Sequence, residues 1–192
     1  MLSPLTTKTV ALHVILGISA AFSCAAPAAD EQPSDEVFER SAFDMGFHIP
    51  SAFTPLGKER GYLQTDHGRA PYRDFSWKKD DDLIVIRQFV VPEVTWREKS
   101  PSQAFADAKN NILTAPEMKL LSERDYDIAG CSAHTFIFQV EGAQPHFERM
   151  DYILTKPDLN IVMYSSPNKA ALDDVACQEL FRNIAITVKT PK

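Results

Sequence analysis

The sequence predicts an α/β fold in which an antiparallel sheet of about six strands lies between helical layers, as an α/β/α sandwich. Short apolar segments with the alternation typical of strands follow one another, separated by turn-forming residues. Two longer segments instead have the apolar spacing of amphipathic helices. The segment Leu83 to Val91 is apolar on both faces, so this strand needs a packing layer on each side of the sheet.

The composition is that of an ordinary globular protein and argues against nucleic acid as a partner. Of the 192 residues, 44% are hydrophobic and 24% are charged, and the formal net charge is −6. No cluster of lysine and arginine is present, although such clusters supply most of the affinity for nucleic acids. The length favours a single domain.

Residues 1–28 have the features of a cleavable signal peptide. Lys8 supplies a positive charge before a 13-residue apolar segment, residues 10–22, which is too short to span a bilayer. The small residues that precede Ala29 are those that signal peptidase accepts, so the mature protein is predicted to begin there. The protein is therefore expected to be periplasmic or secreted.

Two alternatives remain for this leader. It could stay uncleaved as an anchor, or Cys24 could be lipidated, because the preceding residues loosely resemble a lipoprotein signal. A membrane is expected as a partner only if Cys24 carries lipid. Residues 29–42 are polar and predict a tether or a short first helix, and residues 43–190 are predicted to form the single domain.

The first half of the domain is predicted to contain a strand and a hairpin. Alternating apolar residues predict a strand that starts at Phe43 and ends at Pro50. The polar segment 57–70 is expected to be a loop. Strands over 72–78 and 83–91 are then joined by a charged turn.

The second half is predicted to contain a helix, several strands and a last helix. Ser100 and Pro101 suit a helix start, and Gln103 completes a capping box. The predicted strands cover residues 120–127, 135–140, 147–154 and 160–164. Asn168 can cap the last helix, whose apolar stripe continues to Ile184.

Three segments carry a resemblance to a known fold. They are DIAGCSAHTFIFQVEG, RMDYILTKPDLNIVMYSSP and a closing helix that ends in FRNIAITVK. With the order of elements over residues 43–188, they resemble the Mog/PsbP-like fold, which photosystem PsbP proteins, Ran-binding Mog proteins and bacterial envelope proteins such as the DcrB-like group share. The predicted export fits the envelope branch best. The resemblance implies no catalytic residues.

No motif in the sequence predicts a catalytic residue, a cofactor or a metal ion. The GxSxG motif of serine hydrolases and the glycine-rich phosphate-binding motifs are missing from the sequence. One alternative is a small exported hydrolase or metal-dependent enzyme that uses His134, His146 and Glu148, which lie around one predicted hairpin. The protein is nevertheless expected not to be an enzyme.

A second alternative is a small-ligand-binding protein. Tyr62, Tyr72, Trp77 and Trp96 lie in or near the segment 57–77, where they could form an aromatic binding patch. Aromatic side chains on a sheet are more often part of the core.

Cys131 and Cys177 are predicted to form a disulfide in the exported protein. Paired thiols persist in an oxidising compartment. Cys131 starts a predicted strand, and Cys177 lies on the apolar stripe of the last helix, which must pack on the sheet. The leading interpretation is an exported, non-enzymatic envelope protein whose domain binds or supports another protein, expected to be an envelope protein.

Overall fold

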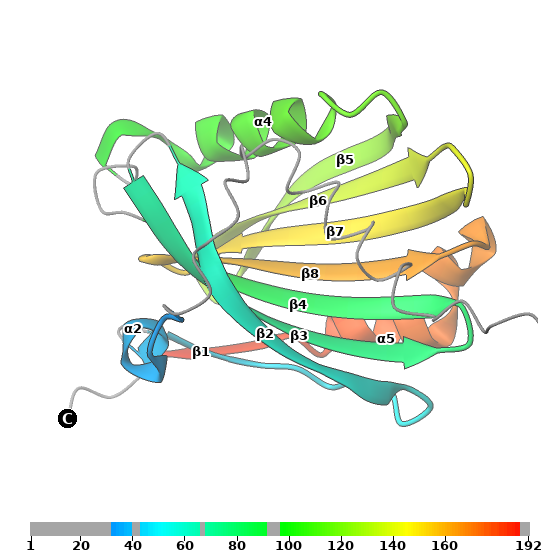
Figure 1. Cartoon of the computed structure of the whole chain (residues 1–192), viewed down its shortest axis with the longest axis horizontal. Coiled ribbons are helices and arrows are strands. Elements are labelled where there is room, and N and C mark those ends of the chain that lie inside the picture. The colour runs from blue at the N-terminus through cyan, green and yellow to red at the C-terminus, as the bar shows by residue number, and fades with distance from the viewer. Residues whose placement is uncertain (1–31, 40–42, 66–67, 92–96, 189–192) are drawn as a thin grey trace, which may run out of the picture.

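A seven-stranded antiparallel sheet is the centre of the fold (Figure 1). A computed structural model describes residues 32–39, 43–65, 68–91 and 97–188. The strands of the sheet lie in the order β2-β3-β4-β8-β7-β6-β5. Their bounds are Thr54–Thr65 (β2), Gly68–Lys79 (β3), Asp82–Val90 (β4), Met118–Ile128 (β5), Cys131–Val140 (β6), His146–Leu154 (β7) and Asp158–Ser166 (β8).

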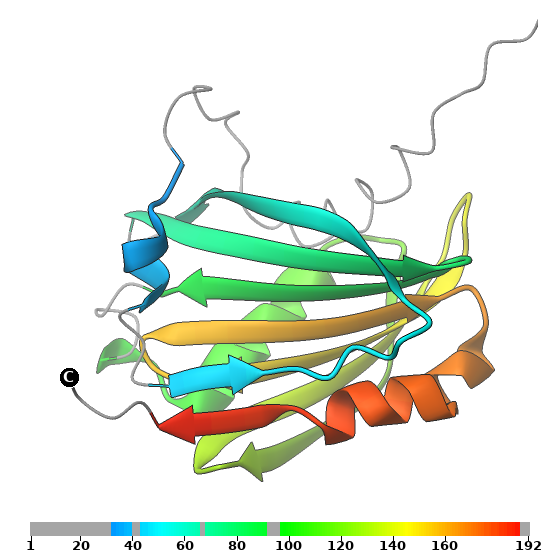
Figure 2. The same ribbon diagram turned by 90° about the horizontal axis from the view of Figure 1, so that it is seen from below.

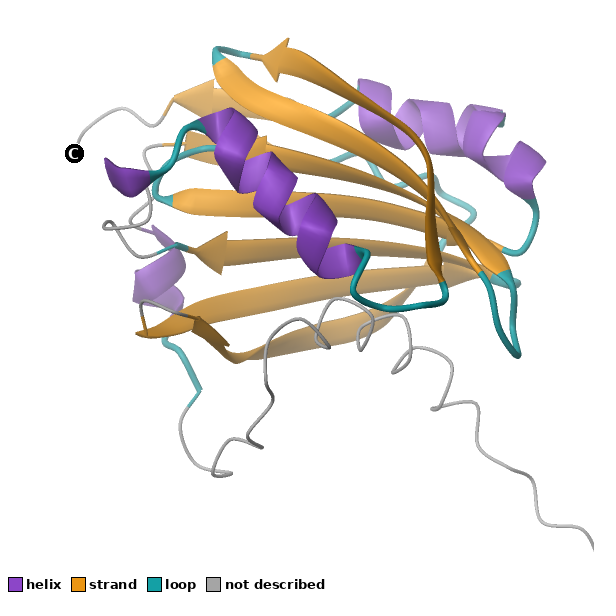
Figure 3. Ribbon diagram, turned by 90° about the horizontal axis from the view of Figure 1, so that it is seen from above, coloured by secondary structure: helices purple, strands orange, loops and turns teal. Residues whose placement is uncertain are grey.

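The two faces of the sheet are covered differently. Helix α4, Pro101–Ile112, lies across one face (Figure 3). The other face carries α5, Val175–Arg182, and a two-stranded sheet of β1, Phe43–Gly46, and β9, Ala185–Val188 (Figure 2). The predicted antiparallel sheet is confirmed, but each helical layer is sparse. Among the described residues, no helix has the length and apolar character needed to cross a membrane.

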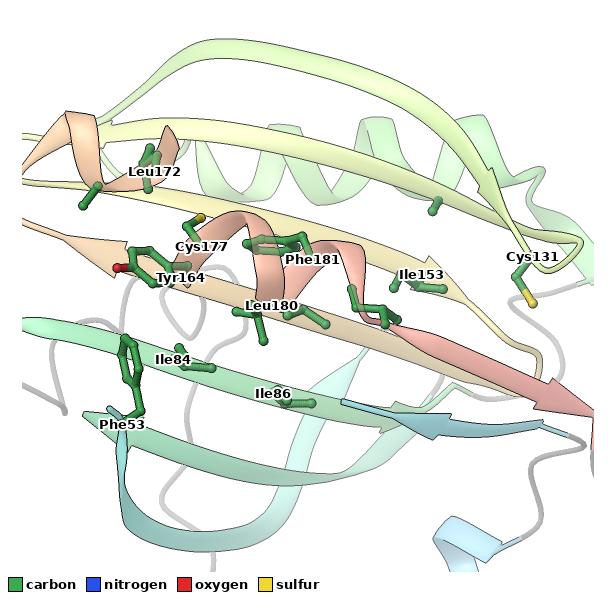
Figure 4. Packing of buried hydrophobic residues seen from close by; sticks show 14 residues of the cluster. Phe53, Ile84, Ile86, Cys131, Ile153, Tyr164, Leu172, Cys177, Leu180 and Phe181 are labelled. Atoms are coloured by element: carbon green, nitrogen blue, oxygen red, sulfur yellow. The ribbon is translucent and has the colours of Figure 1, made fainter. Parts of the chain in front are cut away.

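A separate apolar core lies on each face. The core under α4 contains Phe105 and Ile112 of the helix, and the core under α5 contains Leu180 and Phe181 (Figure 4). Strand β4 contributes to both cores, through Val85 on the α4 face and through its neighbours on the other face. The prediction that this strand is buried on both faces is therefore confirmed.

The two remaining helical segments are short. Helix α2, Asp35–Glu39, lies within the segment expected to be a tether or a first helix, and its Phe38 is fully buried. The 3₁₀ helix η1, Lys169–Asp173, precedes α5 and is capped by Asn168, as predicted. Ser100 forms the predicted capping box at the start of α4.

Two predictions about secondary structure are wrong. In the segment 57–70, predicted to be a loop, residues 57–65 and 68–70 instead belong to the paired strands β2 and β3. Strand β2 is a sheet edge, where charged side chains are common and the apolar alternation of a strand is weak. The last helix is also broken, because Asp174 has an extended backbone and caps α5. Residues 185–188, predicted at the end of that helix, pair with β1 instead.

Candidate functional site

A pocket lies on the α5 face of the sheet, between β1 and strands β3, β4 and β8. Its volume is about 300 Å³, at the lower end of the range for small-molecule sites. We call it the β1 pocket. Its polar lining residues are Asp44, Arg73, Gln88, Thr155, Asp158 and Asn160. Its apolar lining residues are Phe38, Met45, Phe47, Ile49, Phe75, Trp77 and Ile86.

The alternation of the strands gives the floor of the β1 pocket two chemically different ends. Arg73 of β3 lies opposite Gln88 of β4, which lies opposite Asn160 of β8, so the three form a polar row. Side chains two residues apart on a strand point to the same face. Phe75 and Trp77 therefore follow Arg73 along β3, and the floor changes from polar to aromatic.

A chain of hydrogen bonds connects the polar side chains. Arg73 Nε donates to Gln88 Oε1 at 2.7 Å, and Gln88 Nε2 donates to Asp158 Oδ2 at 2.6 Å. Asn160 Nδ2 donates to Thr155 Oγ1 at 2.8 Å. Asp158, Asn160 and Thr155 are all buried. These bonds fix the side chains that form the polar end.

Arg73 lies at the border of the polar and aromatic ends. Its guanidinium lies over the rings of Phe38, at 4.9 Å, and Phe75, at 5.7 Å. Burial lowers the pKa of Arg73, and the nearby carboxylates of Asp35 and Asp158 only partly oppose this effect. The fold thus holds a desolvated cation between two aromatic rings.

The opposite wall consists of β1 and the segment that follows it. Met45, Phe47 and Ile49 alternate with exposed residues and line the pocket. Strand β1 is held there by its pairing with β9, in which Met45 lies opposite Ile186. The polar end is bounded by Phe38 of α2.

The predicted aromatic patch is only partly brought together. Trp77 lines the β1 pocket, where it stacks against Phe75 with the ring centres 6.5 Å apart. Tyr72 packs with the core on the opposite face of the sheet. Tyr62 lies near the end of the hairpin, where Arg69 stacks over its ring at 4.2 Å. Trp96 lies outside the described residues.

The three residues of the hypothetical hydrolase or metal site do not converge. His146 Nε2 lies 2.9 Å from Glu148 Oε1, so these two residues do meet. His134, however, lies opposite Tyr152, whereas His146 lies opposite Val140. Val140 is six positions along β6 from His134, so the two histidines are separated by roughly 20 Å, at about 3.3 Å per residue. Among the described residues, no group of three ligating side chains could hold a metal ion.

His134 instead belongs to a polar cluster at the edge of the sheet. Its Nδ1 lies 2.6 Å from Asp125 Oδ1, and its Nε2 lies 3.3 Å from Glu123 Oε2. Lys109 of α4 also pairs with Glu123, at 2.8 Å. These contacts connect α4 to β5 and β6.

Cys131 and Cys177 are both free in the structure, in contrast to the predicted disulfide. The two belong to the same buried cluster but lie toward different ends of it, with Phe181 and Ile153 between them (Figure 4). Helix α5 does pack on the sheet as predicted, but Cys131 does not lie beside the part of the helix that carries Cys177. Burial raises the pKa of both thiols, to about 12 for Cys177. Cys24 lies outside the described residues.

The polar floor of the β1 pocket is the feature that the sequence prediction missed. Its residues come from strands distant in sequence, so no local motif marks them. One signal was available, because Arg87 and Gln88 interrupt the apolar residues of one predicted strand and Asn160 starts another. Polar side chains at buried strand positions need partners, and here they partner one another.

No protein-family model and no curated protein matches the sequence of this chain. Among solved structures, LpqN of Mycobacterium tuberculosis, described as involved in cell envelope biogenesis, matches with a TM-score of 0.53. The match has 9% sequence identity and covers 83% of this chain and 99% of that chain. The fold of this chain is similar to that of LpqN.

Two further solved structures are more distant. CyanoP, a cyanobacterial PsbP from Synechocystis, matches with a TM-score of 0.44 and 9% identity, over 86% of this chain and 98% of that chain. A protein of unknown function from Pseudomonas aeruginosa matches with a TM-score of 0.44 and 16% identity, over 77% of this chain and 99% of that chain. At these TM-scores neither likeness supports an inference about this chain. The comparisons do not assign it to the DcrB-like branch.

Proposed function

We propose that this protein is an exported, non-enzymatic binding protein that holds part of a partner, expected to be another envelope protein, in the β1 pocket. The observation that carries the proposal is the combination, in one cavity of about 300 Å³, of an aromatic end with a fixed polar end. Apolar surface supplies affinity in such sites, and a few positioned polar groups supply specificity.

The chemistry of the lining supports binding rather than catalysis. No histidine, cysteine, serine or lysine is among the described residues that line the β1 pocket. Its carboxylates are engaged, because Asp158 accepts a hydrogen bond from Gln88, and both Asp44 and Asp158 have further interactions. Nucleophilic and general-base catalysis need a reactive group close to the substrate.

Export to the envelope is the part of the proposal that rests on the leader sequence. Residues 10–22 and the small residues before Ala29 have the pattern of a signal peptide. LpqN is described as involved in cell envelope biogenesis. At 9% identity that likeness concerns the fold, so an envelope role for this chain is supported by its own leader.

The size of the β1 pocket favours a second candidate, a small free ligand. A cavity of about 300 Å³ holds a single large side chain or a compact small molecule. The fluorescence of Trp77, in the floor of the pocket, would change with either occupant. Native mass spectrometry of protein recovered from the envelope separates the candidates, since a small ligand would add a discrete mass to the chain.

Site-specific photocrosslinking in cells tests the proposed function. A photoreactive amino acid at Asp44, an exposed residue at the pocket, is expected to crosslink one discrete partner. The matched control position is Leu113, which is exposed at the end of α4 on the opposite face. Trp77→Ala should weaken the crosslink from Asp44, because it removes part of the aromatic end of the pocket. Equal crosslinking from both positions would reject the proposal.

A further inference from the structure

Arg73 is a cation with unused hydrogen-bond donors at the β1 pocket. A guanidinium group has five N–H donors. Within the described part of the chain, Arg73 donates one hydrogen bond, from Nε to Gln88. Its remaining N–H groups, on the two terminal nitrogens, form the fork that binds carboxylates with two parallel hydrogen bonds.

The carboxylates nearest to Arg73 are engaged elsewhere. Asp35 pairs with Arg60, at 3.2 Å. Asp158 accepts from Gln88 and has a further interaction, as Asp44 does. None of the ion pairs found among the described residues includes Arg73. The aromatic rings and Gln88 therefore orient the guanidinium, and the nearby carboxylates of Asp35, Asp158 and Glu39 compensate its charge only in part.

The charges around Arg73 are of both signs, because the carboxylates of Asp35, Asp158 and Glu39 raise its pKa whereas Arg60 and burial lower it. Arg60 of β2 lies directly opposite Arg73 in the sheet, and like charges in this position repel each other. Lys58 lies over the ring of Phe75, at 5.3 Å. Burial also lowers the pKa of Arg73, as expected for a desolvated cation. A bound anion would relieve both the repulsion and the cost of desolvation.

We infer that the β1 pocket recognises a carboxylate with an apolar group attached, in which the carboxylate pairs with Arg73 and the apolar group lies against Phe75 and Trp77. This inference rests on the proposed function and names the chemistry of the occupant. The carboxylate could belong to a free organic acid or to the C-terminus of a polypeptide whose last residue is apolar.

The geometry of β3 sets the size of the ligand. Alternate residues of a strand are about 7 Å apart, so Trp77 lies roughly 13 Å from Arg73 along the strand. An aromatic or branched group a few bonds from the carboxylate matches this span. The carboxylates of Asp44 and Asp158 also line the pocket, so a ligand with a single negative charge is favoured over a phosphate dianion.

Isothermal titration of the purified protein with matched acids and amides tests the inference. The free-acid probe is 3-phenylpropionate and its neutral control is 3-phenylpropanamide. The peptide probe is a short peptide that ends in phenylalanine with a free carboxylate, and its control is the same peptide amidated. At least one acid is expected to bind at least about tenfold more tightly than its amide, as for a charged hydrogen-bonded pair.

The identity of the preferred acid distinguishes the two sources. Tighter binding of the peptide acid would indicate a polypeptide C-terminus, and tighter binding of 3-phenylpropionate would indicate a free organic acid. Arg73→Gln should remove the preference for acid over amide, and Arg73→Lys should retain part of it, because lysine keeps the charge but not the fork. Thermal unfolding of each variant checks that it is folded.

Arg124→Gln is the matched control. Arg124 is exposed on β5, at the sheet edge opposite β2, so its loss should change the affinity for the acid by less than about threefold. Equal binding of acid and amide, binding of neither acid, or an acid preference that survives Arg73→Gln would overturn the inference. Binding of the amides that quenches Trp77 fluorescence would leave the proposed function standing.

Discussion

Two arginines on opposite faces of the sheet differ in whether a carboxylate pairs with them. Arg87 of β4 is buried on the α4 face and forms a two-pronged pair with Asp74 of β3, in which Nε donates to Oδ1 at 2.7 Å and Nη2 contacts Oδ2. Arg73, one face away, has no such partner within the described chain. The first arginine is part of the scaffold, and the second is available for binding.

The buried pair predicts a large effect of a single substitution on stability. Asp74→Ala should lower the free energy of unfolding by about 3–5 kcal/mol, because it leaves the charge of Arg87 buried and unpaired. Urea denaturation measures the loss. Asp81→Ala, in the exposed turn between β3 and β4, is the control and should change stability by less than about 0.5 kcal/mol. If both variants lost a similar amount of free energy of unfolding, the pair of Arg87 and Asp74 would not make the expected contribution to stability.

Cys131 and Cys177 are expected to react only after unfolding. Both are buried, and burial raises the pKa of each thiol, so little thiolate is available in the folded protein. A thiol reagent should therefore react slowly with the native protein. In denaturant without reductant, both should react quickly. If neither reacts until reductant is added, the disulfide predicted from the sequence forms after all.

His146 and Glu148 predict a dependence of stability on pH. Burial disfavours the charged form of His146, but the hydrogen bonds to Glu148 and to the Gln144 carbonyl outweigh it, so the pKa of His146 is raised above 6.5. A group whose pKa is raised in the folded state stabilises the protein at pH values below its unfolded pKa, which is about 6.5 for histidine. This stabilisation is lost as the pH rises through the folded-state pKa.

The stability difference between the wild type and His146→Gln should therefore shrink as the pH rises from about 6 to about 8. Urea denaturation across this range gives the difference. His48→Gln, at an exposed position, is the matched control and should show a constant difference. A constant difference for His146→Gln as well would mean that its contact with Glu148 carries no charge.

At the scale of the elements, a single capping residue decides where α5 begins. The Asp174 side chain accepts a hydrogen bond from the backbone N–H of Cys177, at 2.9 Å, which separates α5 from η1. Leu180 of α5 is fully buried, so the position of the helix fixes the core on this face.

Asp174→Ala should lower the free energy of unfolding by about 1 kcal/mol, the usual value of an N-cap side chain. The matched control is Asp173→Ala, because Asp173 is the exposed neighbour at the end of η1. Thermal or urea unfolding compares the two. A smaller effect at Asp174 than at Asp173 would contradict the capping role.

Sequence patterns predicted those elements whose signals are local. The capping box at Ser100 and the short apolar segments of β4 and β6 to β8 are properties of consecutive residues, and these elements are confirmed. Strand β9 depends on its pairing with β1, far away in sequence, so its residues matched the helical spacing of the preceding stripe equally well. The β1 pocket could not be predicted for the same reason, although Trp77, one of the aromatic residues considered, lines it.

At the scale of the whole molecule, the proposed export rests on residues 1–28. We expect the protein recovered from the envelope to begin at Ala29, because the residues before it suit signal peptidase. Intact-mass measurement gives the mature start directly. A mass that includes acyl chains on Cys24 would show a lipoprotein, and a mass that includes residues 1–28 would show that the leader is retained as an anchor.

The pairing of β1 with β9 has a consequence for how a newly made chain becomes functional. Gly46 and Ala185, partners in this pairing, are 139 residues apart in sequence. The floor of the β1 pocket needs only β3, β4 and β8, whereas its wall needs β9 to hold β1 in place. Contacts between such distant segments form late, and a chain emerges from its N-terminal end. We therefore expect a chain that lacks β9 to have the floor of the pocket but not its wall, and so not to retain the proposed partner.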